Sequence, residues 1–181
     1  MALEHALLVA LAERPASGLE LARRFERSIG FFWQATHQQI YRVLARMEAD
    51  GWVTVEVVAQ DGRPDKRVHT PSPAGRAALA EWLAEPMGME AFRSDVAVKL
   101  RGASYGDRTV LARHLEGLRA DHAARLAHYE HLEQQQFPHP DRLGPVERDQ
   151  WLVLRGGVRL EQFWIDWITE CLQAQQMEAT P

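Results

Sequence analysis

The chain contains 181 residues, of which 46% are apolar and 25% charged, the composition of an ordinary globular protein of one or two domains. No stretch is apolar enough to span a membrane and the N-terminus lacks a basic flank, so we expect neither insertion nor secretion but a cytoplasmic protein. Its single cysteine excludes an internal disulfide, and its net charge of −4 argues against indiscriminate coating of nucleic acid, which needs an excess of Lys and Arg.

The chain begins with two predicted helices. Apolar residues recur at helical spacing from Leu3 to Leu11, and this helix should stop before Pro15 because a residue ahead of proline avoids the helical region. Ser17 and Glu20 have the spacing of a capping box. They predict the start of a second helix, which should end near Gly30.

A third helix should follow a similar signal. Thr36 and Gln39 again have capping-box spacing, and Gly51 is suited to a left-handed stop after about Asp50. Its apolar side is expected to contain Ile40, Val43, Leu44 and Met47. Its outward side is expected to contain His37, Gln38, Tyr41, Arg42, Ala45 and Arg46.

The next elements predict a two-stranded wing. Residues 52–58 are rich in β-branched side chains at strand length, residues 62–65 have the composition of a turn, and residues 66–70 can return as the partner strand. Ser72 followed by proline then predicts the start of a helix that ends at Pro86. Three helices, a wing and a linker helix make a winged helix-turn-helix.

The second half should be helical only. A short helix is expected from about Ala91 to Leu100, and a helix of roughly thirty residues should end before Pro138. Pro145 marks the start of the last helix. The fold class is therefore mainly α, with a winged helix-turn-helix domain at 1–86 and an all-α domain at 87–181. The long helix has a heptad-like seam of Leu111, Leu115, Leu118, His122, Arg125, Tyr129 and Leu132, weakened at His122 and Arg125.

The last helix carries more apolar surface than one neighbouring helix can cover. Two rows merge into an arc of roughly half the helix circumference. Because the second half supplies few other helices, we predict a homodimer through the C-terminal helices. The rows are Trp151, Leu154, Val158, Ile165, Ile168 and Leu172, and Val153, Gly157, Leu160, Trp164, Trp167 and Cys171.

The distribution of charge supports a local nucleic-acid interface, because neither half of the chain is basic overall. Residues 1–86 have a net charge of −1 and residues 87–181 of −3, yet the cations of the third helix and the wing cluster on two elements. A basic face on an acidic body favours specific over indiscriminate DNA binding. The candidate DNA-binding residues are Thr36, His37, Gln38, Gln39, Tyr41, Arg42, Arg46, Arg63, Lys66 and Arg67.

These residue types suit different contacts with DNA. Gln38, in the first turn of the third helix, can make a bidentate contact with adenine, and Arg42 can contact a phosphate. Tyr41 suits either DNA contact or half-buried packing. Arg46 suits a phosphate, a solvated face or an ion pair with a nearby carboxylate. The wing cations suit phosphate, although any exposed turn can carry such charges.

Several motifs together resemble the PadR family of transcriptional regulators. Residues 92–100 and the tryptophan-bearing last helix resemble the virulence-activator-like helical domain of the longer PadR subfamily. The N-terminal motifs are Ser17–Leu21, Ile40–Val53, Gly62–Arg67 and Gly75.

The resemblance implies a homodimeric repressor that reads a dyad-symmetric operator and is released by an effector. It also implies that Tyr41 is the family's recognition-helix tyrosine and that Arg63, Lys66 and Arg67 are its wing cations. The return strand departs from the family, since His69, Pro71 and Ser72 stand where the family prefers an aromatic residue, an apolar residue and threonine. Because proline cannot donate to a ladder, we expect this strand to end early and the wing to be loose.

Two ligand sites have weaker signals. Trp151, Trp164 and Trp167 could line a pocket for a small aromatic effector, against the alternative that they form structural core. His128 and His131 are spaced to chelate a metal, but no cysteine or carboxylate stands at a matching place, and the alternative is a solvated helix face. We expect no cofactor and no bound metal.

No catalytic motif is present, and Cys171 lies in the apolar arc of the last helix, so we expect no enzyme. Two rival hypotheses remain open. One is a winged-helix module for protein interaction or ligand sensing without specific DNA binding, and the other is a metal-responsive sensor that uses the histidines.

Overall fold

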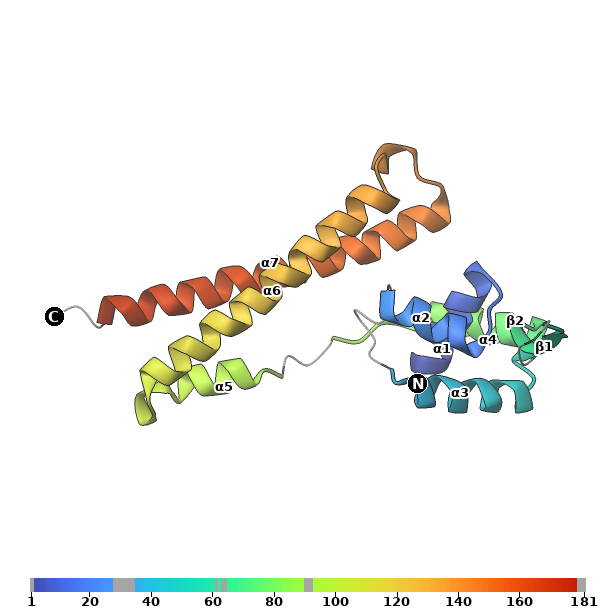
Figure 1. Cartoon of the computed structure of the whole chain (residues 1–181), viewed down its shortest axis with the longest axis horizontal. Coiled ribbons are helices and arrows are strands. Elements are labelled where there is room, and N and C mark those ends of the chain that lie inside the picture. Colours follow the sequence, from blue (N-terminus) through green and yellow to red (C-terminus); the bar gives the residue numbers. More distant parts are fainter. Residues whose placement is uncertain (1, 28–34, 61, 63–64, 90–92, 179–181) are drawn as a thin grey trace. The chain divides into compact units, whose positions relative to one another are not determined.

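The computed structural model describes residues 2–27, 35–60, 62, 65–89 and 93–178. These residues form helices and one two-stranded sheet, in two compact units, Met1–Gly88 and Met89–Pro181 (Figure 1). No helix in the described ranges is both long and apolar enough to cross a bilayer. The elements are α1 (Ala2–Glu13), α2 (Gly18–Arg27), α3 (His37–Ala49), β1 (Val53–Val58), β2 (Lys66–Pro71), α4 (Pro73–Ala84), α5 (Asp95–Arg101), η2 (Ala103–Tyr105), α6 (Arg108–Gln136), η3 (Pro140–Arg142) and α7 (Pro145–Glu178).

The first unit packs helices α1 to α4 and the wing around one apolar core. The buried side chains of this core come mainly from α1, α2 and α3, and Trp52 and Leu79 pack against its edge. Gly51 has a φ of 71°, the left-handed stop expected after α3. The fully buried large residues of this core are Leu7, Leu8, Leu11, Leu21, Phe25, Ile40, Leu44 and Met47.

The wing is an antiparallel pair in which Val53 lies opposite Pro71 and Val58 opposite Lys66. The expectation that β2 would end before Pro71 is therefore wrong. Ser72 donates its N–H to the carbonyl of Trp52, so this pair is hydrogen-bonded and the preceding pair, at Pro71, is not. The nitrogen of Pro71 faces away from β1, where no ladder bond is required, and the strand tolerates the proline.

The junction between the wing and α4 is closely packed. The Ser72 hydroxyl donates to the carbonyl of Gly51 at 2.6 Å and accepts from the N–H of Gly75 at 3.0 Å, which caps α4 as predicted. A Cβ at Gly75 would lie 2.1 Å from the carbonyl oxygen of Trp52. Because that neighbour is backbone, only glycine fits, and the start of α4 can lie directly against the backbone that precedes β1.

The second unit is a long antiparallel hairpin of α6 and α7 with the short α5 beside it (Figure 1). Apolar residues such as Leu115, Ile168 and Leu172 form its core. The prediction of a mainly α fold with a winged helix and an all-α second unit is confirmed. The short helix begins later than expected, at Asp95 after the capping Ser94, and residues 90–92 lie outside the described residues.

Polar groups tie α6 to α7 where the apolar seam is interrupted. The Nδ1 atom of His122 lies 2.5 Å from a carboxylate oxygen of Glu161, and both side chains are buried. Arg125 completes this group with an ion pair to Glu161 at 3.4 Å. The two residues that weaken the heptad pattern thus supply a hydrogen-bonded contact, which can fix the register of the hairpin.

Candidate nucleic-acid interface

The third helix presents a rigid polar face. Its capping box is formed as predicted, because the N–H of Gln39 donates to the Thr36 hydroxyl at 3.2 Å and the Gln39 side chain accepts from the N–H of Thr36 at 2.9 Å. The predicted inward residues are buried and the predicted outward residues are exposed. Thr36 and Gln39 therefore use polar atoms to fix the start of α3, while Gln38 and Arg42 lie exposed on its outer face.

Tyr41 lies half in and half out of the domain. Its side chain is 49% exposed, yet its ring approaches the first residue of α2, where a Cβ on Gly18 would lie 2.4 Å from Cε1 of the ring. The ring therefore has a packing partner and an exposed edge at once. The half-buried packing expected for this tyrosine is present, and its contact with DNA stays a prediction.

The cations predicted to meet DNA fall into two groups. Arg46 forms an ion pair with Glu4 at 3.1 Å, Lys66 with Glu20 at 2.8 Å, and Arg67 with both carboxylate oxygens of Glu48 at 2.7 and 2.8 Å. Arg42 has no ion pair within the part of the chain that the structure describes. Arg63 lies outside the described residues.

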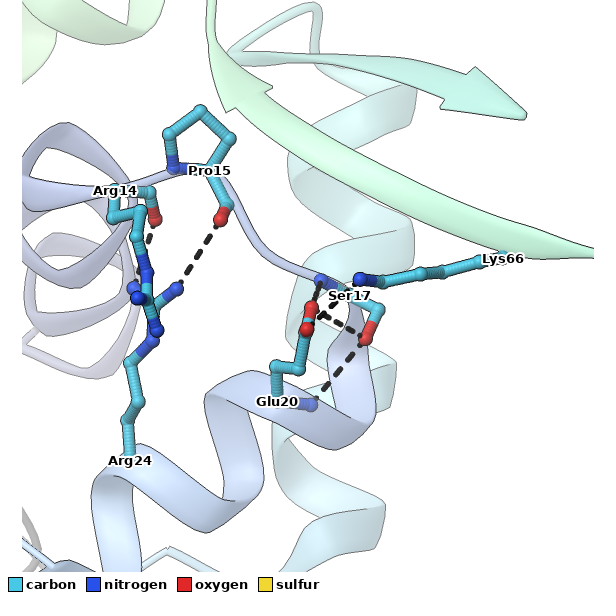
Figure 2. A network of polar contacts seen from close by, with 6 residues as sticks. All are labelled: Arg14, Pro15, Ser17, Glu20, Arg24 and Lys66. Atoms are coloured by element: carbon cyan, nitrogen blue, oxygen red, sulfur yellow. Dashed lines mark hydrogen bonds and ion pairs between the residues drawn. The ribbon is translucent and has the colours of Figure 1, made fainter. Parts of the chain in front are cut away.

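Glu20 links the wing to the start of α2 (Figure 2). One carboxylate oxygen accepts from the N–H and hydroxyl of Ser17 at 2.9 and 3.0 Å, and the other accepts from Nζ of Lys66. The Lys66 hydrogen bond and the bond from the Ser17 N–H lower the pKa of Glu20 to about 2. The capping box predicted for α2 is confirmed, but its role as an anchor for the wing had no local sequence signal because Lys66 is distant along the chain.

The turn between α1 and α2 is clamped from both sides. Figure 2 shows the Arg24 guanidinium donating to the carbonyls of Arg14 and Pro15, at 2.8 and 3.1 Å. The guanidinium also donates to the carbonyl of Ala10 at 3.0 Å. On the other side, Ala16 exchanges two backbone hydrogen bonds with His69 of β2. The wing is therefore bonded to this turn as well as to α3.

His69 itself is buried, and its Nδ1 atom has no hydrogen-bond partner within the described structure. Burial lowers the pKa of His69, because a charged imidazole would lose its hydration there. Burial therefore favours the neutral form of this ring.

The three tryptophans of the predicted effector pocket do not lie together. Trp164 and Trp167 pack with ring centroids 5.4 Å apart, and Trp164 also stacks on His122. Trp151 lies thirteen residues earlier on α7, about 20 Å along the helix axis. Its Nε1 donates to Glu133 of α6 at 2.8 Å, so within one chain Trp151 connects two helices and cannot share a pocket with the other two.

The histidines give no support to a metal site in the described segments. No group of three or more His, Cys, Asp or Glu side chains is placed there to hold an ion. His122 is engaged with Glu161, and the ring of His128 lies beside that of Tyr129.

Comparison with known proteins matches both units. The model of the PadR-like transcriptional regulator family matches residues 7–81, and that of the virulence activator alpha C-terminal domain matches residues 92–176. A "probable transcriptional regulator" of Mycobacterium tuberculosis is 48% identical over 97% of this chain and 98% of its own length.

Two solved structures share the whole fold. The virulence activator AphA of Vibrio cholerae is 31% identical, with a TM-score of 0.81 over 97% of this chain and 98% of its own. Bacillus subtilis PadR in complex with operator DNA is 22% identical, with a TM-score of 0.85 over 96% and 99%. The chain belongs to the PadR-like family of transcriptional regulators.

Proposed function

We propose that this regulator is a cytoplasmic homodimer whose two α3 helices read the half-sites of a dyad-symmetric operator. The observation that carries the proposal is the outer face of α3, a capped helix on which Gln38 and Arg42 are exposed. A glutamine amide can hydrogen-bond an adenine edge in two places, and an arginine with no ion pair among the described residues can bind a phosphate. The B. subtilis protein solved on operator DNA supports the proposal through its shared fold alone, because it is only 22% identical. The choice of DNA-reading residues therefore rests on the α3 side chains of this chain.

The dimer is proposed from the face of α7 that the hairpin does not cover. Leu154, Val158, Ile168 and Leu172 are buried in the second unit. A neighbouring set of apolar side chains on the same helix remains about half exposed, namely Leu152, Val153, Leu160 and Phe163. An exposed apolar row of this length is typical of a protein interface. A second copy covers it and sets the spacing between two α3 helices.

The direct test uses DNA from upstream of the protein's own gene. Gln38→Ala and Arg42→Ala should weaken binding in fluorescence anisotropy while light scattering still shows the dimer. Arg76→Ala is the matched control, because Arg76 is an exposed cation of the same unit on α4. If the wild-type protein bound this DNA and unrelated DNA equally at all salt concentrations, a protein-docking winged helix would be the better description.

The wing needs a separate test because its cations already have partners. Lys66→Ala should reduce the slope of log affinity against log salt by about one unit if Nζ contacts a phosphate. A slope equal to that of the wild type would assign Lys66 to Glu20 alone. Arg67→Ala answers the same question for the pair with Glu48.

Repression and release by a small aromatic effector remain predictions. The first is tested by the transcript level of the adjoining gene after deletion of the regulator, which rises for a repressor and falls for an activator of the kind that the V. cholerae relative is named for. The second is tested by titrating aromatic acids against the DNA complex. In this proposal an effector acts by changing the distance between the half-site readers.

A further inference from the structure

We propose that Gly18 is a positioning residue for DNA reading, because its missing side chain provides the space in which the Tyr41 ring is held. This inference rests on the proposed function, since it concerns how α3 presents Tyr41 to the operator. Gly18 itself does not touch DNA, and it affects DNA binding only through the position of the Tyr41 ring.

The geometry is a direct contact between the start of α2 and the outer edge of α3. A Cβ built on Gly18 would lie 2.4, 2.9 and 3.0 Å from Cε1, Cδ1 and Cζ of Tyr41. Any side chain at position 18 would occupy space that the ring fills. Gly18 is the first residue of α2, directly after Ser17, whose hydroxyl and N–H are fixed by Glu20. The surface under the ring is therefore well ordered.

A methyl group at position 18 should move the ring and leave the backbones in place. Gly18 is buried under the ring, but the three atoms nearest to a built Cβ all belong to Tyr41, and α2 and α3 are held together by other buried residues, among them Leu21, Phe25 and Ile40. The tyrosine ring is 49% exposed and can rotate about χ1 toward solvent. Gly18 is also not among the described glycines with positive φ, so alanine suits its backbone.

The consequence for DNA follows from the order of residues on α3. Tyr41 is adjacent to Arg42 and lies one helical turn after Gln38, so its side chain leaves α3 from the same face as theirs. A tyrosine hydroxyl can bind a phosphate oxygen. Because the ring is already restricted by Gly18, less conformational freedom is lost when that contact forms.

The first experiment is a double-mutant cycle on the full-length protein with the operator used above. Gly18→Ala should weaken binding by about fivefold, the equivalent of about 1 kcal/mol for one unrestrained side chain. Its melting temperature should be unchanged or higher, because alanine is the better helix residue. In a Tyr41→Ala background, the same change should have no further effect on affinity.

The possible results of the double-mutant cycle can be told apart. Wild-type affinity in Gly18→Ala would overturn the inference, and so would an equal loss in both backgrounds, which would place position 18 itself against DNA. A wild-type protein that fails to bind the operator would instead overturn the proposed function. Gly117→Ala is the control substitution, since Gly117 lies on exposed α6 with nothing within 4 Å of a built Cβ.

A second experiment needs no DNA and covers the case in which Gly18→Ala folds poorly. The Hα protons of Gly18 should show ring-current shifts in the NMR spectrum of the wild type and of Tyr41→Phe, which keeps the ring. Tyr41→Ala should abolish the shift. Equal Gly18 resonances in all three proteins would show that the ring does not rest on this glycine and would overturn the inference.

Discussion

Helices α3 and α7 are both amphipathic, but they leave opposite kinds of surface exposed. Helix α3 buries its whole apolar row inside its own unit, with Ile40 and Met47 at most 1% exposed, and presents polar side chains outward. Helix α7 buries one apolar row against α6 and leaves a second, including Leu160 and Phe163, about half exposed. The first arrangement suits a polar partner such as DNA, and the second suits another apolar surface.

The largest expected effect is on the α7 side of this comparison. Phe163→Glu places a charge in the exposed apolar row and should weaken dimerisation by ~100-fold or more, since an unpaired charge is costly in a buried interface. Light scattering across a dilution series should show half the mass. Gln162→Glu adds the same charge at an exposed polar neighbour and should remain dimeric. A dimeric Phe163→Glu would assign the interface to another face.

The next effect concerns the stability of the unit that carries α3. Gly75→Ala should lower the free energy of unfolding of this unit by about 2 kcal/mol, because the new methyl meets the backbone carbonyl of Trp52 and cannot be accommodated by a side-chain rotation. Thermal denaturation should show a loss of ~10 °C for the winged-helix unit. Gly117→Ala, which adds a methyl in open space, should show no such loss.

A third prediction separates the two groups of cations. Arg42→Ala should weaken operator binding by about tenfold, the value of one charge-assisted hydrogen bond, because Arg42 carries no ion pair in the described structure. Arg67→Ala should cost less, since Arg67 must first give up its two contacts with Glu48. Equilibrium anisotropy titrations at one salt concentration compare them. The reverse order would place the wing rather than α3 at the centre of the interface.

The smallest effect is a pH dependence that arises in the wing. Burial lowers the pKa of His69 in the folded protein below its ordinary value of 6.5, so the unfolded chain binds the proton more readily. The contribution of neutral His69 is complete above pH 6.5 and is lost as the pH falls below it. His69→Phe should remove this dependence and stabilise the unit at pH 5 by about 1 kcal/mol, partly because an unpaired Nδ1 is no longer buried. Denaturant titrations at pH 5 and pH 8 measure both effects. Equal pH dependence in the two proteins would contradict the assignment.

Local patterns predicted the features that depend on neighbouring residues. The capping boxes at Ser17 and Thr36, the stop at Gly51 and the cap at Ser72 all involve residues a few positions apart, and each is formed. The buried row of α3 also followed from periodicity alone. Such signals depend on backbone geometry within one or two helical turns.

Features that depend on distant residues were missed or wrongly predicted. The pair of Lys66 with Glu20 joins residues 46 positions apart, and the contact of Gly18 with Tyr41 joins two helices. The strand was expected to end before Pro71, but Pro71 lies at a non-hydrogen-bonded pair of the ladder, where its nitrogen faces away from the partner strand. The pocket predicted from three tryptophans needs them close together, but within one chain Trp151 lies thirteen positions before Trp164 on the same helix.

The attachments of the wing have a consequence for how regulation can operate. Strand β2 is bonded to the α1–α2 turn through Ala16 and Glu20, and to α3 through the pair of Arg67 with Glu48. A wing held at three places moves as one piece with the helix it accompanies. In the proposed homodimer, each winged-helix unit would then bind its half-site as one rigid body. An effector in that proposal changes the distance between the two units and leaves the shape of each unit as it is.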